Sequence, residues 1–510
     1  MELLTNKQTV AINEVIYDSA VEQPVECDVL LPDYCPDVVR ILKCMVAPAD
    51  VAAHVEGDKL TMDGIASIQV YYVGEESAIR CVDYKVPYSK IVELKSPPAN
   101  PIINCTATVS YLNCRAVNQR RLDIRGALSI SCRVIGRREE EVITSADSVE
   151  LKCRLCDCTD LVGQQSRTFS VREELELGYG KPPIGSIIRS EACCNITDYK
   201  VVTGKVIIKG DLNLHVLYQG QDGGNQLQTM EYTLPVSQIV DVDGVDEDCI
   251  CDVRLQVCSV SLEPRPDGNG ECITVAGDIT LNAVVRVHRP QSVAMAEDCY
   301  STKYECTYQA RQVPTMRLEH CVDQNVMYKD TMDLPEHVSA VLDTWSNVSG
   351  IQTRMADGRM MMDCKITVSM FTMDENQQLT YFDRTVDYET PIEEAAGMGD
   401  NFLFDPSVQV LSTSYSMSGS GQIEVRCDLK ICGCIYTMCR KHAICEIAVD
   451  EERPKKCDPT VGLYLYRASK GETLWDIAKH YNTSTRYIME ENGLTDESLD
   501  DRRMLIIPMV

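Results

Sequence analysis

The chain has 510 residues, of which 44% are hydrophobic and 25% are charged, so its composition is that of a globular protein with roughly three domains and a remainder. Its formal net charge of −28 disfavours nucleic acid phosphates and anionic lipids as partners, and no local basic cluster offsets it. The first residues lack the basic and then apolar pattern of a signal peptide, and no window of ~18 uninterrupted apolar residues predicts a membrane span. We therefore expect a cytoplasmic protein with no nucleic acid partner and no membrane insertion.

Segments of the chain recur with a period of about 150 residues. One set is GIASIQVYY from Gly64, GDLNLHVLY from Gly210 and CKITVSMFT from Cys364. A second set is RGALSISCRVIG (125–136), AGDITLNAVVRV (276–287) and RCDLKICGCIYT (426–437), aligned so that Leu128, Ile279 and Leu429 correspond. Self-similarity at several places along one period predicts a threefold internal repeat.

Apolar and polar residues alternate in every matched segment, which is the pattern of half-buried antiparallel strands. Turn sequences such as QDGG (221–224), PDGNG (266–270) and SMSGSG (416–421) separate these strands and predict hairpins. The predicted fold class is mainly β, with three repeated antiparallel β-rich modules near residues 11–150, 160–300 and 315–450. A small C-terminal βααβ domain is expected at 461–509.

The 26 cysteines are about 5% of the residues, fewer than a short disulfide scaffold has, and most alternate along predicted strands as small apolar groups do. A reducing cytosol suits this usage, although exposed thiols would oxidise if the protein later met air. The strongest candidate for metal binding is KCRLCDC, with Cys153, Cys156 and Cys158. Zinc needs four ligands in a tetrahedron, and the adjacent Cys193 and Cys194 would supply a second pair poorly. We therefore expect thiols on a strand or loop, and no metal.

Sequence signatures of catalysis are missing from the β-rich part of the chain. None of the seven histidines stands in a zinc-protease, deaminase or nucleophile-elbow motif, and no glycine-rich phosphate loop follows a strand. The acidic run DVDGVDED (241–248) lacks the spacing and the closing glutamate of a calcium loop. We expect neither catalytic residues nor a cofactor, and no enzymatic activity.

The C-terminal segment has a denser pattern than the rest of the chain. LYLYRAS (463–469) predicts a strand, and Thr473 with Asp476 predicts the capped start of a helix with Leu474, Ile477, Ala478 and Tyr481 on one face. A second helix should begin at Thr483 or Ser484 and end at Asn492 and Gly493, before the strand MLIIP (504–508).

This βααβ segment resembles the LysM module, and the matching residues are Tyr466, Gly471 to Leu474, Ile477 with Ala478 and Tyr481, Ile488 with Asn492 and Leu494, and Leu505 with Ile507 and Pro508. Glu472 replaces the usual aspartate, and Arg502 stands where the family commonly has glycine. LysM modules usually bind N-acetylglucosamine chains in a groove between two loops. The resemblance implies a groove formed by Gly471, Glu472, Thr473, Leu474, Asn492, Gly493, Leu494 and Thr495. Trp475 is the ninth predicted groove residue, although it could either pack in the core or stack on a ligand.

Three β repeats followed by LysM resemble the SipL family of spore morphogenetic proteins, whose repeats are called SPOCS domains. Members act in the mother-cell cytosol, where their LysM module is implicated in binding the coat ATPase SpoIVA at the forespore surface. A groove in the cytosol would meet no murein, which also favours a protein ligand. The resemblance implies a non-enzymatic scaffold of spore coat assembly with a SpoIVA-like partner. The alternative is a protein that binds peptidoglycan of the cell wall or the spore cortex.

Overall fold

The structure is a computed structural model that describes residues 5–75, 78–221, 227–335, 338–395, 401–417, 421–455, 462–469, 471–497, 499 and 504–508. Strands dominate these residues, and both α-helices lie near the C-terminus. Parts of the predicted turns at 221–224 and 416–421, and Arg502, lie outside the described residues.

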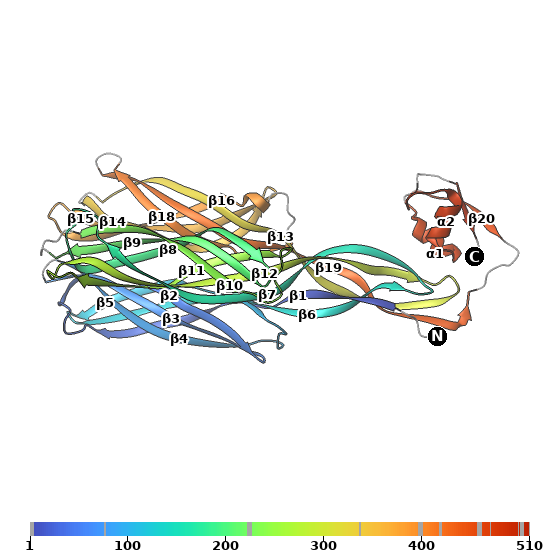
Figure 1. The fold of residues 1–510 in the computed structure, drawn as a ribbon, viewed down its shortest axis with the longest axis horizontal. Coiled ribbons are helices and arrows are strands. Elements are labelled where there is room, and N and C mark those ends of the chain that lie inside the picture. The colour runs from blue at the N-terminus through green and yellow to red at the C-terminus, as the bar shows by residue number, and fades with distance from the viewer. Residues whose placement is uncertain are drawn as a thin grey trace.

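Strands from residue 5 to residue 454 form three repeats, and each repeat contains two antiparallel sheets (Figure 1). The first sheet of each repeat contains the longest strands, and we call it the long-strand sheet. In repeat 1 it consists of β1 (Thr5–Leu30), β6 (Arg121–Ala146) and β5 (Ile102–Asn118), and in repeat 2 of β7 (Glu150–Glu176), β12 (Cys272–Tyr300) and β11 (Ile250–Pro266). In repeat 3 it consists of β13 (Tyr304–Asp333), β19 (Gln422–Pro454), β17 (Phe402–Phe404) and β18 (Ser407–Met417). The second, shorter sheets contain β2 (Val38–Glu56), β3 (Lys59–Gly74) and β4 (Ile79–Glu93), then β8 (Ile184–Val202), β9 (Lys205–Gly220) and β10 (Leu227–Asp241), then β14 (Val338–Ala356), β15 (Arg359–Asp374) and β16 (Leu379–Pro391). A 3₁₀ turn, η1 (Glu393–Ala395), follows β16.

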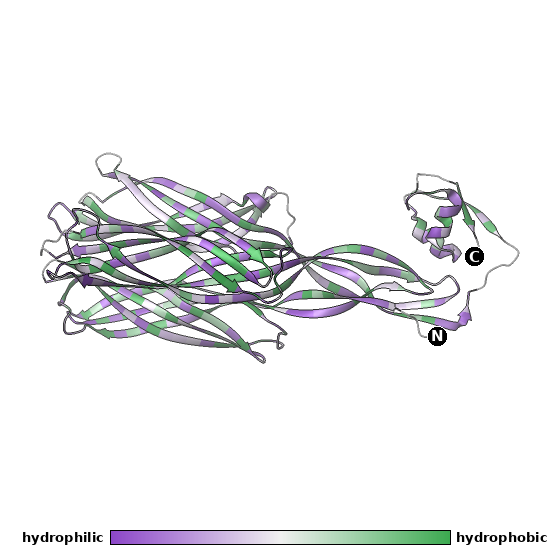
Figure 2. Cartoon of the chain, in the orientation of Figure 1, coloured by the Kyte–Doolittle hydropathy of each residue, from purple (hydrophilic) through white to green (hydrophobic). Residues whose placement is uncertain are grey.

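The alternating sequence pattern explains how the two sheets of a repeat pack. Buried and partly exposed residues alternate along the central strand β3, and green and purple bands alternate along most strands in Figure 2. Each repeat encloses its own apolar core between its two sheets, with Ile68 and Leu128 in repeat 1 and Val368 and Leu429 in repeat 3. The predicted fold class of repeated antiparallel β modules is therefore confirmed.

The three repeats also meet one another at equivalent positions. Tyr71, Leu217 and Phe371 occupy the same place in the central strands β3, β9 and β15, and all three belong to one buried cluster. Contacts between equivalent residues are expected where repeats close around a common axis, so the body of the protein has approximate threefold internal symmetry.

Charged residues break this symmetry beside the buried cluster. Lys43, Arg189 and Asp343 lie opposite these residues in register, each next to a β-bulge. Arg189 donates to Asp343 at 3.1 Å, and both side chains are almost fully buried. His215 also contacts Asp343 at 2.8 Å, and the Arg189 guanidinium lies 4.3 Å from the ring centroid of Trp345. Equivalent positions of repeats 2 and 3 thus carry opposite charges, and the ion pair between them distinguishes these two repeats.

A stalk extends from the body beyond the short sheets (Figure 1). It consists of three two-stranded ribbons, formed where the start of β1, β7 and β13 pairs with the end of β6, β12 and β19. Equivalent residues again meet inside it, and its core contains Val10, Ile12, Val142, Cys156, Cys158, Val293, Met295, Val313 and Ala443. Because each ribbon buries one face against the others, the stalk has an apolar interior.

The C-terminal domain follows β19 and has the predicted βααβ order. It contains β20 (Leu463–Arg467), α1 (Leu474–Tyr481), α2 (Thr485–Asn492) and β21 (Met504–Pro508), with β20 and β21 antiparallel. Figure 1 places it at the end of the stalk, far from the body. Within the described part of the chain, no helix is long and apolar enough to cross a membrane.

Candidate functional site

Side-chain caps position the two helices of the C-terminal domain as the sequence predicts. Thr473 accepts a hydrogen bond from the Asp476 amide at 3.2 Å and donates to the Asp476 carboxylate at 2.6 Å, which starts α1. Ser484 accepts from the Tyr487 amide at the start of α2, and Gly493 ends that helix with φ +60°. The positions of both predicted helices are therefore confirmed.

Asn492 connects the end of α2 to the last strand. Its amide nitrogen donates to the carbonyls of Ile488 at 2.7 Å and Ile506 at 2.6 Å, while its oxygen accepts from the Ile506 amide at 2.7 Å. A side chain that bonds both its own helix and β21 orders the loop that follows.

Glu472 has a similar role in the loop before α1. One carboxylate oxygen accepts from the Ser469 amide and the other from the Tyr466 hydroxyl, each at 2.7 Å. These two hydrogen bonds lower the pKa of Glu472. Glu472 therefore holds the loop in shape through its charged form.

The nine predicted groove residues divide into three groups by exposure. Gly471, Thr473, Gly493 and Thr495 are exposed, and Glu472, Asn492 and Leu494 are partly exposed. Leu474 and Trp475 are buried, with 0% and 5% of their surface exposed. Leu494 packs against the cluster that contains Leu474, so the roots of the two loops meet in one core. The surface offered to a ligand thus consists of loop backbone and short polar side chains.

Trp475 packs against the stalk, which answers the question that the sequence left open. Its ring lies edge-on to Tyr300 at the end of β12, with centroids 4.9 Å apart. Its indole N–H donates to the Asp298 carboxylate at 2.8 Å. The Tyr300 hydroxyl in turn donates to the Thr483 carbonyl at 2.7 Å. Trp475 is the only aromatic residue among the nine predicted groove residues, and it contacts the end of the stalk instead of facing the groove.

Lysines complete this contact. Lys479 on α1 pairs with both oxygens of Asp298, at 2.7 and 2.8 Å. Burial opposes ionisation of Asp298, but the bonds from Lys479 and Trp475 outweigh it and lower its pKa. Lys455, just after β19, donates to Asn482 at 2.7 Å and to the Ser301 carbonyl at 2.8 Å. We call Asp298, Tyr300, Trp475 and Lys479 the docking contact. Sequence reasoning missed it because no local pattern links residues about 180 positions apart.

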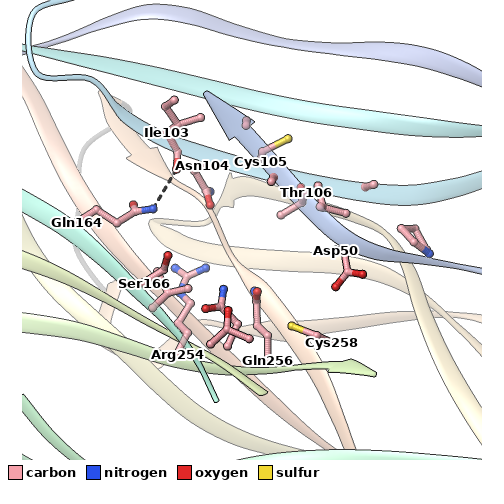
Figure 3. Close-up of a pocket in the computed structure, with 18 of the residues that line it drawn as sticks. Asp50, Ile103, Asn104, Cys105, Thr106, Gln164, Ser166, Arg254, Gln256 and Cys258 are labelled. Atoms are coloured by element: carbon pink, nitrogen blue, oxygen red, sulfur yellow. Dashed lines mark hydrogen bonds between the residues drawn. The ribbon is translucent and has the colours of Figure 1, made fainter. Parts of the chain in front are cut away.

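A second concave region lies between repeats 1 and 2 and encloses about 610 Å³ (Figure 3). Asp50, Asn104 and Thr106 face Arg254 and Gln256 across it. Its charges are largely paired, since Arg254 and Arg286 share Asp252 and Arg286 also donates to Gln164.

The corresponding cleft between repeats 2 and 3 is bridged instead. Lys430 occupies the position of Asn282, which lines the cavity, and donates to Asn195 at 3.0 Å. The cavity is thus a place where the internal symmetry fails.

The cysteines considered as metal ligands differ in their exposure to solvent. Cys156 and Cys158 are buried in the stalk core, while Cys153 is exposed. Among the described residues, no group of three or more His, Cys, Asp or Glu side chains is arranged to hold a metal ion.

Two known domain families match parts of this chain. The model of the SipL SPOCS domain matches residues 37–117 and 183–264, and the LysM domain model matches residues 466–508. The matched SPOCS segments run from β2 to β5 and from the loop before β8 into β11, and β14, β15 and β18 repeat that arrangement. No curated protein and no solved structure matches the chain.

The fold and these matches define a protein of repeated SPOCS domains with a C-terminal LysM domain. The resemblance to the SipL-like sporulation proteins is confirmed, because the chain contains both domains in the expected order. SPOCS and LysM are non-catalytic binding domains.

Proposed function

We propose that the chain is a non-enzymatic scaffold of spore coat assembly, whose LysM domain binds a coat morphogenetic protein, a SpoIVA-like ATPase, at the forespore surface. The mother-cell cytosol is the proposed location. The three β modules, near 11–150, 160–300 and 315–450, then act as a spacer that ends in the stalk. If the partner is a polymer, many weak LysM contacts retain the scaffold through effective concentration.

The position of Trp475 carries this proposal. Trp475 is buried against Tyr300 and Asp298, so its ring is not free to stack on a sugar. The exposed loop residues Gly471, Thr473, Gly493 and Thr495 instead offer backbone groups and hydroxyls. This surface suits hydrogen bonds with a protein segment, and it stays open while the docking contact is made.

Peptidoglycan is the second candidate ligand. The match of the LysM family model over 466–508 and the ordered loops around Gly471 and Gly493 favour it. Hydroxyl-rich glycan chains can bond the same backbone groups that a peptide would use.

A substitution at Thr495 tests the groove without disturbing the fold. Glu472 and Leu494 are poor choices, because Glu472 orders its loop and Leu494 packs on the core. Thr495 is exposed, so Thr495→Arg adds bulk and charge only to the proposed contact surface. Thr108→Arg, on an exposed face of β5 in repeat 1, is the matched control.

The full-length variants are compared in two assays, capture by the purified coat ATPase and sedimentation with insoluble murein at moderate salt. We expect Thr495→Arg to weaken ATPase capture at least tenfold and to disperse the protein from the forespore, whereas Thr108→Arg does neither. Unchanged ATPase capture together with lost murein sedimentation would overturn the proposal in favour of the glycan.

A further inference from the structure

Two cysteines lie side by side beneath the LysM domain. Cys299 is the penultimate residue of β12, and Cys306 is the third residue of β13. Their sulfur atoms are 3.8 Å apart. A disulfide needs about 2.05 Å, so the two sulfurs must approach by about 1.7 Å, a shift that side-chain rotation can supply. Cys299 is buried, whereas Cys306 is partly exposed to solvent.

The charges around the pair differ between the two sulfurs. The hydrogen bond from Cys299 lowers the pKa of Cys306 to about 7, with help from the ammonium groups of Lys455 and Lys479, although burial and Asp298 oppose this shift. The same hydrogen bond, together with burial, raises the pKa of Cys299. Of the two thiols, Cys306 therefore ionises more readily than Cys299, and thiolate is the nucleophilic form.

Neighbouring residues tie the pair to the docking contact. Asp298, the residue before Cys299, receives the bonds from Trp475 and Lys479. Lys479 belongs to the LysM domain, so its charge acts on Cys306 only while that domain is docked.

We propose that Cys299 and Cys306 form a redox modification site, at which a hydroperoxide generates a disulfide that joins repeat 2 to repeat 3 beneath the docked LysM domain. The bond closes a loop of only a few residues, so it adds little by restricting the unfolded chain. Its effect is to fix the end of β12 against β13, the surface on which Trp475 rests. The inference does not depend on what the LysM domain binds.

The chemistry is a two-electron oxidation. The Cys306 thiolate attacks one peroxide oxygen, the O–O bond breaks, and the leaving hydroxide or alkoxide takes up a proton. Cys306 is then a sulfenic acid. The Cys299 sulfur attacks the Cys306 sulfur, the S–O bond breaks, and hydroxide leaves with the proton of Cys299 as water. Each thiol loses one electron and one proton, and the peroxide is reduced to water, plus an alcohol when it is organic.

A second pair in the same molecule serves as an internal reference. Cys321 on β13 and Cys434 on β19 are directly opposite in register, with sulfur atoms 3.6 Å apart. Neighbouring antiparallel strands bring opposite Cα atoms within the range that a disulfide requires. This pair lies away from the LysM domain, so Lys479 should not affect it.

The experiment oxidises the reduced full-length protein with hydrogen peroxide at pH 7, blocks remaining thiols by alkylation, and maps disulfides by mass spectrometry. Trypsin cleaves after Lys303, between the two cysteines, so their disulfide appears as two cross-linked peptides. We expect this link in the wild type. In Cys299→Ser, Cys306 should stop at sulfenic acid, which a dimedone reagent traps.

Lys479→Gln tests the coupling to the docked domain. Loss of the Lys479 charge should raise the pKa of Cys306 and lower its thiolate fraction at pH 7, so oxidation should slow severalfold. The rate at Cys321 should stay unchanged. Failure of Cys306 to oxidise while Cys321 and Cys434 cross-link would overturn the proposal. Equal rates at Cys306 in the wild type and in Lys479→Gln would overturn the coupling.

Discussion

Removing the Asp298 carboxylate should release the LysM domain from the stalk. Asp298 accepts the indole N–H of Trp475 at 2.8 Å and pairs with Lys479 at 2.7 Å. A hydrogen bond to a charged group contributes about 1.5–3 kcal/mol, whereas the Lys479 pair, with 41% of the lysine side chain exposed, contributes about 0.5–1 kcal/mol after screening. Asp298→Ala should therefore weaken docking by roughly 2–4 kcal/mol, or about 30- to 900-fold.

The composition of the chain supplies a direct assay. The sequence has 2 tryptophans, and Trp345 is buried in the body, so acrylamide quenching of tryptophan emission reports mainly on Trp475. Undocking exposes the indole face that now contacts Tyr300, and we expect quenching to increase in Asp298→Ala. The matched control is Asp278→Ala, because Asp278 pairs with Arg172 on an exposed face of repeat 2.

A double variant makes the result decisive. Asp298→Ala combined with Tyr300→Ala also removes an edge-to-face aromatic contact of about 0.5–1.5 kcal/mol and the Tyr300 hydrogen bond to Thr483. If quenching of this variant equals that of the wild type, the docking contact does not hold the LysM domain and the reasoning fails.

Three further predictions concern the interior. Arg189→Met should cost about 3 kcal/mol in urea unfolding, because the buried Asp343 carboxylate loses its guanidinium partner and keeps the contact with His215, and adding Asp343→Asn should recover part of that loss. Burial lowers the pKa of His288 to about 4, so the unfolded state binds the extra proton between pH 6.5 and 4. Stability should therefore fall by about 2 kcal/mol from pH 7 to pH 5 at this site, and His288→Gln should flatten that dependence in urea titrations. Asn492→Ala leaves the Ile506 amide without its partner and should destabilise the LysM domain by about 2–4 kcal/mol, seen as faster hydrogen exchange in 462–508 alone.

Local patterns in the sequence predicted the elements well. Alternation identified the strands because one face of each sheet is buried, and the caps at Thr473 and Gly493 identified the helices because their geometry depends on neighbouring residues. The alignment of Gly64, Gly210 and Cys364 is confirmed, since these residues have the same place in β3, β9 and β15.

The second repeat alignment was wrong by two residues in repeat 2. The long-strand sheet has a register shift next to Ile135 in repeat 1, next to His288 in repeat 2 and next to Tyr436 in repeat 3. When the repeats are aligned on this position, Leu128 corresponds to Leu281 and Leu429. The sequence alignment had paired Leu128 with Ile279 instead. A shift by two keeps every side chain on the same face, so the alternating pattern cannot detect it.

The sequence could not predict the contacts between residues that lie far apart in the chain. The pairing of Arg189 with Asp343, and the docking contact, both join residues more than 150 positions apart. Such contacts depend on how the repeats close around their axis, and no residue pattern within one repeat specifies that arrangement. Trp475 illustrates the limit, because its own helix predicts burial and a stacking platform equally well.

The end of the stalk explains why the LysM domain docks at one of three similar ribbons. A bulge recurs at Thr144, Glu297 and Cys445, so the residues that follow it are equivalent in the three repeats. Repeat 2 continues with Asp298, Cys299 and Tyr300, whereas repeats 1 and 3 continue with Ser-Ala-Asp (145–147) and Glu-Ile-Ala (446–448). Only the first of these triplets combines a carboxylate for Trp475 and Lys479 with an aromatic ring. The backbone offers three positions, and side-chain chemistry selects one. The same triplet contains the thiol that faces Cys306, so docking and the proposed thiol oxidation share the ribbon of repeat 2.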